Sequence, residues 1–178
     1  MDITSFVLGL MKGRKSGKGF YSTEENEAGG MTYSFSATEA GGDDGDIGAE
    51  KYIEARYAEV VLPNAKSLKP YAFYDDDVLT HIEMPKMTSI GRGAFQRCYK
   101  LAITSLPSGV THIEDYAFNG CSGITAITFE GKPTTIGKTA FNSCNNLTTI
   151  NVPWAEGEVA SAPWGATNAT INYNYTGG

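Results

Sequence analysis

The sequence predicts a repeat solenoid, mostly β, in which short units stack behind one another along a parallel sheet. Three observations predict this fold class. Phenylalanine recurs at a nearly constant interval, each copy has the same companions at fixed offsets, and proline ends most of the units. Self-similarity at a fixed period of this size is the signature of a repeat architecture. The recurring residues are Phe73, Phe95, Phe118 and Phe141, spaced 22, 23 and 23 residues apart.

Each unit has the same columns around its phenylalanine. Alanine precedes it, a cysteine or aspartate follows three residues later, and leucine or isoleucine comes three residues after that. A pair of mostly apolar residues, separated by one position, closes the unit. Five columns that hold their register over four units establish an internal repeat. The columns beside phenylalanine are Ala72, Ala94, Ala117 and Ala140; Asp76, Cys98, Cys121 and Cys144; Leu79, Leu101, Ile124 and Leu147; Ile82, Thr104, Ile127 and Ile150; and Met84, Leu106, Phe129 and Val152.

The closing pair of each unit predicts a short strand. In Ile150-Asn151-Val152, two apolar residues point to one side and a polar residue to the other, as a half-buried strand requires, and Pro153 ends it. The Ala-Phe-x-x-Cys-x-x-Leu stretch has threefold spacing, which favours a short helical turn or a wound loop. One unit alone buries little, so we expect a right-handed solenoid with one parallel sheet of about five short strands, spanning ~20–25 Å.

The repeat register extends past both ends of this region. Upstream, Tyr57, Val60, Leu62 and Pro63 fill the columns of a further unit. Downstream, residues 154–178 are predicted to form a degenerate last rung, because the outer rung of a stacked array must cover an open apolar end. In that rung Val159 follows Ile136 by 23 residues, Trp164 is in the phenylalanine column, and Tyr173 and Tyr175 are in the strand columns.

One internal unit departs from the pattern. Ile103 stands one position before Thr104, which occupies the column that isoleucine fills in the other units. An extra residue between two paired positions is typical of a bulge. We therefore expect a local bulge at this point of the sheet.

Residues 1–56 differ from the rest of the chain in charge and composition. The formal charge is +3 over residues 1–20, −7 over residues 21–56 and −2 over residues 57–178, and the first 56 residues are rich in glycine. Glycine raises the entropy cost of ordering, so this extended or helical segment is expected to need a partner. The predicted parts are a docking or oligomerisation segment (1–56), the solenoid (57–153) and the capping rung (154–178).

The repeat unit resembles a known family. The pattern Ile113-x-x-x-Ala117-Phe118-x-x-Cys121-x-x-Ile124-x-x-Ile127-x-Phe129 looks like the BspA-like (type 5) leucine-rich repeat, as do the units that begin at Ile90 and Ile136. The resemblance covers residues 57–153 and implies a leucine-rich-repeat solenoid. Such repeats occur in bacterial adhesins, protozoan surface proteins and bacteriophage virion proteins, so the resemblance implies an interaction module.

The first residues carry a second resemblance. The opening from Asp2 to Gly13 and the Gly/Lys stretch after it are similar to the N-terminal segment of phage tail and head appendage proteins, and the Trp-containing C-terminus is similar to the end of phage-borne repeat proteins. This resemblance implies a peptide that docks the chain onto a particle. A helix folded back as a cap on the solenoid and a peripheral membrane helix are the alternatives. The candidate docking residues are Ile3, Phe6, Val7, Leu10 and Met11.

The titratable residues predict no catalytic, metal or cofactor site. One cysteine per rung is typical of a small buried residue filling a column, and the spacing does not match metal ligands. The acidic runs at 43–46 and 75–77 lack the pattern of a calcium loop and favour solvated loops. Because Asp76 replaces cysteine in its column, we expect this rung to be more open to water. A repeat column does not bring His81 or His112 together with a serine and an aspartate.

The outward middle positions of the strands are the candidate binding residues of the sheet face. They are small and polar, without the aromatic or arginine anchors that dominate interaction hot spots, so a plain solvated face is the alternative. Aromatic residues gather instead at Tyr71, Phe73 and Tyr74 and near the C-terminus. The sheet-face candidates are Glu83, Ser105, Thr128 and Asn151, with Val61 in the first unit.

These observations predict a bacteriophage virion structural protein, a tail or head appendage or decoration. Its solenoid would contact protein partners, a host-surface receptor or a glycan. The alternative is a BspA-like adhesin at the bacterial cell surface. The net charge of −6 argues against nucleic-acid binding. No apolar run is long enough to span a membrane, and no secretory signal is recognisable. We expect assembly in the host cytoplasm as a homo-oligomer, with a trimer as the expected form, because avidity strengthens a weak docking peptide.

Overall fold

The computed structural model describes residues 20–25, 31–36, 46–47, 58–62 and 65–177. This part of the chain is built from thirteen short strands in three sheets and contains no helix. The strands are β1 (Phe20–Glu25), β2 (Met31–Ser36), β3 (Asp46–Ile47), β4 (Glu59–Val61), β5 (Ser67–Leu68), β6 (His81–Glu83), β7 (Ser89–Ile90), β8 (Ser105–Leu106), β9 (His112–Ile113), β10 (Ala126–Phe129), β11 (Thr135–Ile136), β12 (Thr149–Asn151) and β13 (Thr170–Asn172).

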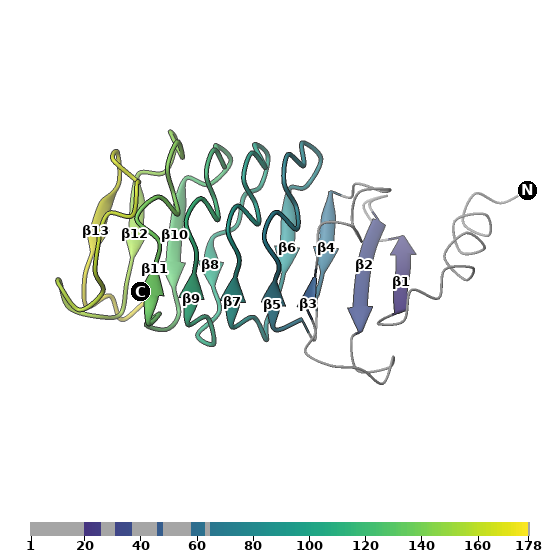
Figure 1. The fold of residues 1–178 in the computed structure, drawn as a ribbon, viewed down its shortest axis with the longest axis horizontal. Helices are drawn as coiled ribbons and strands as arrows, with labels where there is room; N and C mark the ends of the chain where they lie inside the picture. Colours follow the sequence, from purple (N-terminus) through teal and green to yellow (C-terminus); the bar gives the residue numbers. More distant parts are fainter. Residues whose placement is uncertain (1–19, 26–30, 37–45, 48–57, 63–64, 178) are drawn as a thin grey trace, which may run out of the picture.

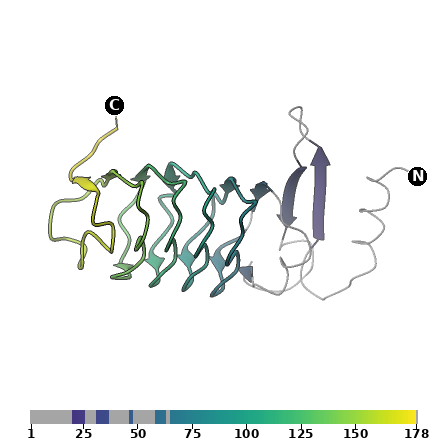
Figure 2. The same cartoon turned by 90° about the horizontal axis from the view of Figure 1, so that it is seen from above.

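The strands line up in two rows along the solenoid, so the predicted parallel-sheet solenoid is confirmed (Figure 1). One row holds β4, β6, β8, β10, β12 and β13, and its neighbouring strands pair in parallel register except between β6 and β8, as in Ile127 opposite Ile150. The other row holds β3, β5, β7, β9 and β11, also parallel. Seen from above, the two rows form opposite walls of the solenoid (Figure 2).

The second row corrects the prediction of a single parallel sheet. Its strands are only two residues long, and β5, β7, β9 and β11 each have an exposed or half-exposed first residue and a buried second one, as in Ser89–Ile90. Two residues cannot display the alternation by which a strand is recognised in sequence. The column of Leu68, Ile90, Ile113 and Ile136 was therefore not predicted as a strand, although it forms a hydrogen-bonded ladder.

The Ala-Phe-x-x-Cys stretches form wound turns, one of the two predicted alternatives. Within a rung, the Ala94 N–H donates to Gly91 O (3.1 Å) and the Gln96 N–H to Gly93 O (3.0 Å). Between rungs, the Phe95 N–H donates to Ala117 O at 2.7 Å. The turns thus carry a ladder of their own, and they protrude as a row of loops along one edge of the molecule (Figure 1).

A column of stacked phenylalanine rings forms the centre of the core. Phe73, Phe95, Phe118 and Phe141 are buried, with successive ring centroids 5.3, 5.3 and 5.2 Å apart and ring planes within 14° of parallel. Full burial of such a side chain contributes roughly 1.5–3 kcal/mol. Each phenylalanine ring is buried only where it packs against the adjacent rungs, so the stability of the solenoid depends on the stacking of its rungs.

The cysteine column is buried, as its spacing predicts. The three cysteines form no disulfide bond, and each thiol donates to the carbonyl of a phenylalanine on the preceding rung, as in Cys121 Sγ to Phe95 O at 3.0 Å. Burial raises the pKa of the Cys144 thiol to about 11, and burial also raises the pKa of Cys121 well above its usual value. The three side chains fill space in the column, and Cys121 and Cys144 stay protonated at neutral pH.

Asp76 corrects one expectation about this column. The side chain is only 2% exposed, so the rung is not more open to water at this point. Its Oδ1 accepts hydrogen bonds from the backbone N–H groups of Val78 (2.9 Å) and Leu79 (3.0 Å). Aspartate commonly satisfies the backbone of a following turn in this way, which lets a carboxylate replace a thiol in the column.

The irregular unit around Ile103 interrupts the first row. Ladders run from β1 to β6 and from β8 to β13, but β6 and β8 are not paired as strands. Ile103 is buried and Thr104 exposed, which agrees with the shift of one position in the sequence. A single backbone bond, from the Ala102 N–H to Thr80 O at 2.9 Å, continues the connection.

The C-terminal rung closes the solenoid with tryptophan. Trp154 and Trp164 are buried, with ring centroids 6.4 Å apart, and both pack against Phe129. The predicted strand columns are wrong: Ile171 of β13 pairs opposite Ile150, because the last rung is two residues shorter than expected. Tyr173 is half-buried against the core, and Tyr175 is exposed.

At the N-terminal end, strand pairing continues upstream of residue 57. β1 and β2 form an antiparallel pair, β2 pairs in parallel with β4, and β3 pairs in parallel with β5. The predicted upstream rung is confirmed at Val60 and Leu62, both buried. Tyr57, Pro63 and the candidate docking residues Ile3, Phe6, Val7, Leu10 and Met11 lie outside the described residues.

Candidate functional site

The predicted sheet-face residues do not form one cluster. Thr128 and Asn151 are half-buried neighbours, joined by a hydrogen bond from Asn151 Nδ2 to Thr128 Oγ1 (3.2 Å). Asn172 Nδ2 donates in turn to Asn151 Oδ1 at 2.8 Å. These polar groups are therefore already paired with one another.

The other two candidates lie on either side of the interruption in the sheet. Ser105 is exposed and pairs through its backbone with Thr128. Glu83 is on β6, where its carboxylate lies 3.6 Å from the ring of His81 and its side chain is 62% exposed. The described part of this face is thus acidic at Glu83 and neutral and polar at Ser105, Thr128 and Asn151. None of these candidate residues is an aromatic anchor.

A different surface gathers the exposed aromatic residues. It lies on the turns that follow β5, β7 and β9, on three neighbouring rungs. Tyr71, Tyr74 and Tyr99 are 41%, 44% and 45% exposed, although large aromatic side chains are normally well covered. We define the tyrosine–arginine patch as Tyr71, Tyr74, Arg92, Arg97, Tyr99 and Tyr116.

Arg97 organises one half of the patch. Its Nε donates to the Tyr99 hydroxyl at 3.0 Å and lies 3.0 Å from Asp75 Oδ1 on the preceding rung. Its guanidinium carbon lies 5.9 Å from the centre of the Tyr99 ring. The hydrogen bond to Tyr99 and the charge of Asp75 raise the pKa of Arg97 above its usual value, so it stays charged. The arginine thereby fixes an exposed ring in one orientation.

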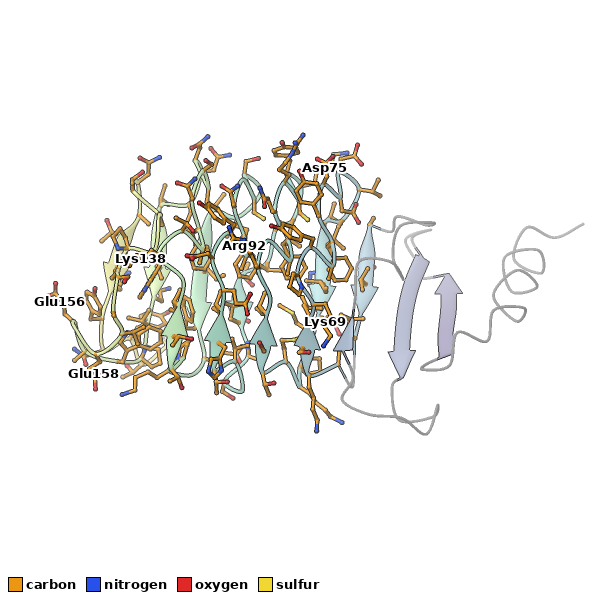
Figure 3. All side chains as sticks on the ribbon, viewed as in Figure 1. Lys69, Asp75, Arg92, Lys138, Glu156 and Glu158 are labelled. Atoms are coloured by element: carbon orange, nitrogen blue, oxygen red, sulfur yellow. The ribbon has the colours of Figure 1, made fainter. Side chains whose placement is uncertain are left out.

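Arg92 organises the other half (Figure 3). Its guanidinium lies over the ring of Tyr116, with the carbon 5.2 Å from the ring centre, within the range of a cation–π contact. A hydrogen bond with Tyr71 is the main cause that raises the pKa of Arg92. Tyr71 also packs edge-to-face on Tyr74, with centroids 5.7 Å apart. Tyr74 in turn has a hydrogen bond with Arg97, so the two halves adjoin each other.

Three patch residues adopt a backbone conformation that normally favours glycine. Tyr71, Arg97 and Tyr116 have φ values of 60°, 66° and 62°. Left-handed φ costs an L-residue of this kind on the order of 1–2 kcal/mol. The conformation belongs to the turn of the repeat, because Asp75 and Ser143 also have positive φ in the Arg97 column. On other rungs the same columns hold Gly93 and Gly120, at φ 59° and 78°.

Gly93 also makes room for the patch. A Cβ atom at this position would lie 2.7 Å from Cε1 of the Tyr71 ring. The ring of Tyr71 can therefore lie across the neighbouring rung only because that rung has glycine there. The sequence thus alternates tyrosine, glycine and tyrosine along one column.

A shallow recess of about 310 Å³ adjoins the patch. It is lined by Arg92, by Asp115 and by residues of β9 and β11. Asp115 Oδ1 accepts hydrogen bonds from the hydroxyl (2.9 Å) and backbone N–H (3.2 Å) of Thr139.

Tyr71 and Tyr74 were predicted as part of an aromatic cluster, whereas Arg92, Arg97, Tyr99 and Tyr116 were not predicted from the sequence. These four residues are 21 to 45 positions away from Tyr71, and only the stacking of rungs brings them together. The sequence did contain one sign of this surface, because large side chains occupy column positions where other units have glycine.

The described part of the chain contains no group of three or more histidine, cysteine or acidic side chains arranged to hold a metal ion. No helix that is long and apolar enough to cross a membrane occurs among the described residues.

Comparison with known proteins identifies the class of protein. A family model of the BspA type leucine-rich repeat region matches residues 46–161 in six copies. The match covers well over half of the chain, so the chain belongs to the BspA type leucine-rich repeat family. Comparison with curated proteins finds no significant match.

One of three similar solved structures shows the same fold. The leucine-rich repeat protein of T. pallidum matches with a TM-score of 0.50 and 20% identity, over 88% of this chain and 80% of that one. A leucine-rich cell surface protein from Faecalibacterium prausnitzii has a TM-score of 0.47 and 22% identity, over 76% of this chain. A leucine-rich repeat protein from Bacteroides ovatus has a TM-score of 0.38 and 16% identity. The chain spans 38% of the Faecalibacterium protein and 45% of the Bacteroides protein.

Proposed function

We propose that this protein is a non-catalytic recognition module that binds its target through the tyrosine–arginine patch. The solenoid is the rigid support, because each rung is tied to the next by backbone ladders and the phenylalanine stack. The single observation that carries the proposal is the exposed, strained and mutually fixed set of tyrosines and arginines on adjacent turns.

Residue chemistry supports this choice of surface. Tyrosine and arginine are the residues that most often dominate binding energy, since they combine a large contact area with hydrogen-bonding groups. Here the rings are held in place by Arg92 and Arg97 before any target arrives. A preorganised surface loses less side-chain entropy on binding.

The site of display in this proposal is a bacteriophage particle, where the chain serves as a tail or head appendage or decoration. The similarity of residues 2–13 to phage docking peptides supports it. In this arrangement Ile3, Phe6, Val7, Leu10 and Met11 attach a homo-oligomer, proposed to be a trimer, and the patch contacts the host surface. Light scattering of the full chain tests the oligomer, which a monomeric mass would contradict.

The second candidate is display at a bacterial cell surface as an adhesin. Membership of the BspA type family favours it, because the family includes surface adhesins. Immunogold labelling of purified particles and of cell envelopes separates the two. Gold on particles supports the virion proposal, and gold confined to envelopes supports the adhesin.

Binding to intact cells of the host bacterium tests the recognition function itself. The fluorescently labelled full chain is compared with the double variant Tyr74→Ala/Tyr99→Ala. Both side chains are exposed and neither has left-handed φ, so the variant is expected to fold. Tyr175→Ala is the matched control, because Tyr175 is an exposed tyrosine outside the patch. We expect at least tenfold weaker binding for the double variant alone.

The same assay tests the sheet face as the competing surface. The double variant Ser105→Ala/Thr128→Ala removes two outward hydroxyl groups and leaves the backbone pairing of β8 with β10 intact. Loss of binding in this variant, with the patch variant unaffected, would overturn the proposal in favour of the sheet face.

A further inference from the structure

We infer that the recess beside Arg92 binds a small diamino acid, a molecule with one carboxylate and two ammonium groups. This site goes beyond the proposed recognition function, and its test does not depend on that function. Three observations carry the inference. The opposite charges that line the recess form no ion pair with one another, the two carboxylates are tied to different rungs, and apolar side chains complete the lining.

The recess is lined by one cation and two anions. Arg92, Glu114 and Asp115 all line it, and its volume of about 310 Å³ is at the lower end of the range for small-molecule sites. Among the residues that the structure describes, no ion pair joins Arg92 to either carboxylate, and none joins Asp115 to Lys138 on the next rung. A ligand with one negative and two positive charges therefore complements the lining.

Arg92 is held in position to bind the carboxylate of such a ligand. Its guanidinium lies over the ring of Tyr116, with the carbon 5.2 Å from the ring centre, and it has a hydrogen bond with Tyr71. A guanidinium presents several N–H donors in a planar fork that matches the two oxygens of a carboxylate. The contacts with the two tyrosines leave further donors of this fork available. Because the side chain is already fixed, binding costs little of its conformational entropy.

The two carboxylates are tied to rungs on opposite sides. Glu114 Oε2 accepts a hydrogen bond from the backbone N–H of Arg92, on the preceding rung, at 2.8 Å. Asp115 Oδ1 instead accepts from the hydroxyl (2.9 Å) and the backbone N–H (3.2 Å) of Thr139, on the following rung. Each carboxylate has a second oxygen that can accept from an ammonium group. A ligand with two separated ammonium groups can therefore pair one with each carboxylate.

The rest of the lining suits the carbon chain of a diamino acid. Ile113 and Ile136 are buried residues whose remaining surface lines the recess. Gly137 leaves room for the carboxylate of Asp115, because a Cβ atom at this position would lie 2.7 Å from Asp115 Oδ1. Methylene groups gain free energy when apolar surface covers them. A short methylene chain between the two ammonium groups therefore fits beside the isoleucines.

Titration calorimetry of the full chain tests the site with three probes. L-lysine has all the required charges, L-norleucine lacks the side-chain ammonium, and cadaverine is lysine without its carboxylate. We expect L-lysine to bind the wild type, and we expect L-norleucine and cadaverine to bind at least tenfold more weakly. Each analogue leaves one charged group of the recess without its partner.

Two variants locate the binding in the recess. Asp115→Asn removes the negative charge but can still accept from Thr139, and Glu114→Gln can still accept from the backbone of Arg92, so both are expected to fold. Each should bind L-lysine at least tenfold more weakly than the wild type. The control is Glu156→Gln, because Glu156 is an exposed carboxylate on the C-terminal rung, at one end of the solenoid (Figure 3). It should bind L-lysine within twofold of the wild type. Thermal midpoints recorded beside the titrations verify folding.

Three results would overturn the inference. Failure of L-lysine to bind the wild type would contradict the site itself. Cadaverine binding as tightly as L-lysine would show a plain cation site, in which Arg92 binds no carboxylate. Unchanged affinity for L-lysine in both folded variants would show that the ligand binds elsewhere. None of these results affects the binding of the chain to cells, so the two proposals fail independently.

Discussion

The ring of Phe118 lies nearly parallel to that of Phe95, with centroids 5.3 Å apart and planes inclined by 14°. The two residues are 23 positions apart in sequence, and this contact is one step of a stack that crosses four rungs. Because each ring contacts only its neighbours, stability is approximately a sum over adjacent rungs. The same stacking aligns the surface turns.

The phenylalanine stack gives the first prediction. Phe118→Ala is expected to lower the free energy of unfolding by about 3–5 kcal/mol, because it removes a buried ring from the middle of the stack and leaves a cavity. Urea denaturation followed by circular dichroism measures this. The exposed control Tyr175→Ala should change stability by less than about 0.5 kcal/mol. Equal effects for the two variants would contradict a stacked core.

Cys144 predicts a loss of stability at alkaline pH. Its pKa is raised by burial from 9.0 to about 11, so the folded state holds the thiol proton more tightly than the unfolded state. This contribution is fully present below pH 9 and is lost between about pH 9 and pH 11. Its size is on the order of 2 kcal/mol.

The test of this pH dependence compares the wild type with Cys144→Ser. The serine hydroxyl does not titrate in this range and can still donate to Phe118 O, as the thiol does. The stability of the wild type should therefore fall more steeply from pH 9 to pH 11 than that of the variant. Parallel pH curves would show that the thiol makes no such contribution.

The left-handed backbone at Arg97 predicts that glycine is more stable than alanine at this position, the reverse of the usual order. Its φ of 66° means that Arg97→Gly should be more stable than Arg97→Ala by about 0.5–1 kcal/mol, although both remove the same side chain. Gln96, next to it, is not among the residues with positive φ. There the order should reverse, with Gln96→Ala the more stable of the pair. Denaturation of all four variants measures this, and glycine being worse at both positions would contradict left-handed strain at Arg97.

The burial of Trp164 predicts that the C-terminal rung stabilises the end of the solenoid. It is fully buried, and its Nε1 donates to Ala160 O at 2.8 Å. Trp164→Ala should cost about 3–5 kcal/mol by leaving a cavity at the end of the core. Thermal unfolding should show a lower midpoint and, because apolar rings become uncovered, light scattering should show a larger mass than that of the wild type. Unchanged stability together with an unchanged mass would exclude a capping role.

Much of the fold could be predicted because its signals repeat. The phenylalanine of the Phe118 column recurs in all four units, and the residue types of the Cys121 and Ile127 columns recur in three of the four, so that each recurrence is an independent sign of the same stacked position. Two-residue strands such as Ser89–Ile90 have no internal alternation, so the second sheet could not be recognised in this way. The last rung was misaligned because β13 follows β12 after 21 residues instead of 23.

The candidate site could be predicted only in part. Isolated exposed tyrosines such as Tyr74 and Tyr99 carry no sign in sequence that they will share a surface. Their proximity follows from the pitch of the rungs, and their orientation follows from Arg97 and its pairing with Asp75. Strain at Tyr71 and Tyr116 is likewise a property of the folded backbone, although the glycine between them in the same column hints at it.

The most direct test of the recognition surface is the binding of the variant Tyr71→Gly/Tyr116→Gly to intact host cells, with its thermal midpoint recorded beside it. Ser143→Gly, also at positive φ but outside the patch, is the control. The account predicts that the double variant unfolds within a few degrees of the wild type, since glycine relieves the strain, and binds at least tenfold more weakly. Full binding by this folded variant would contradict a recognition role for the tyrosine–arginine patch.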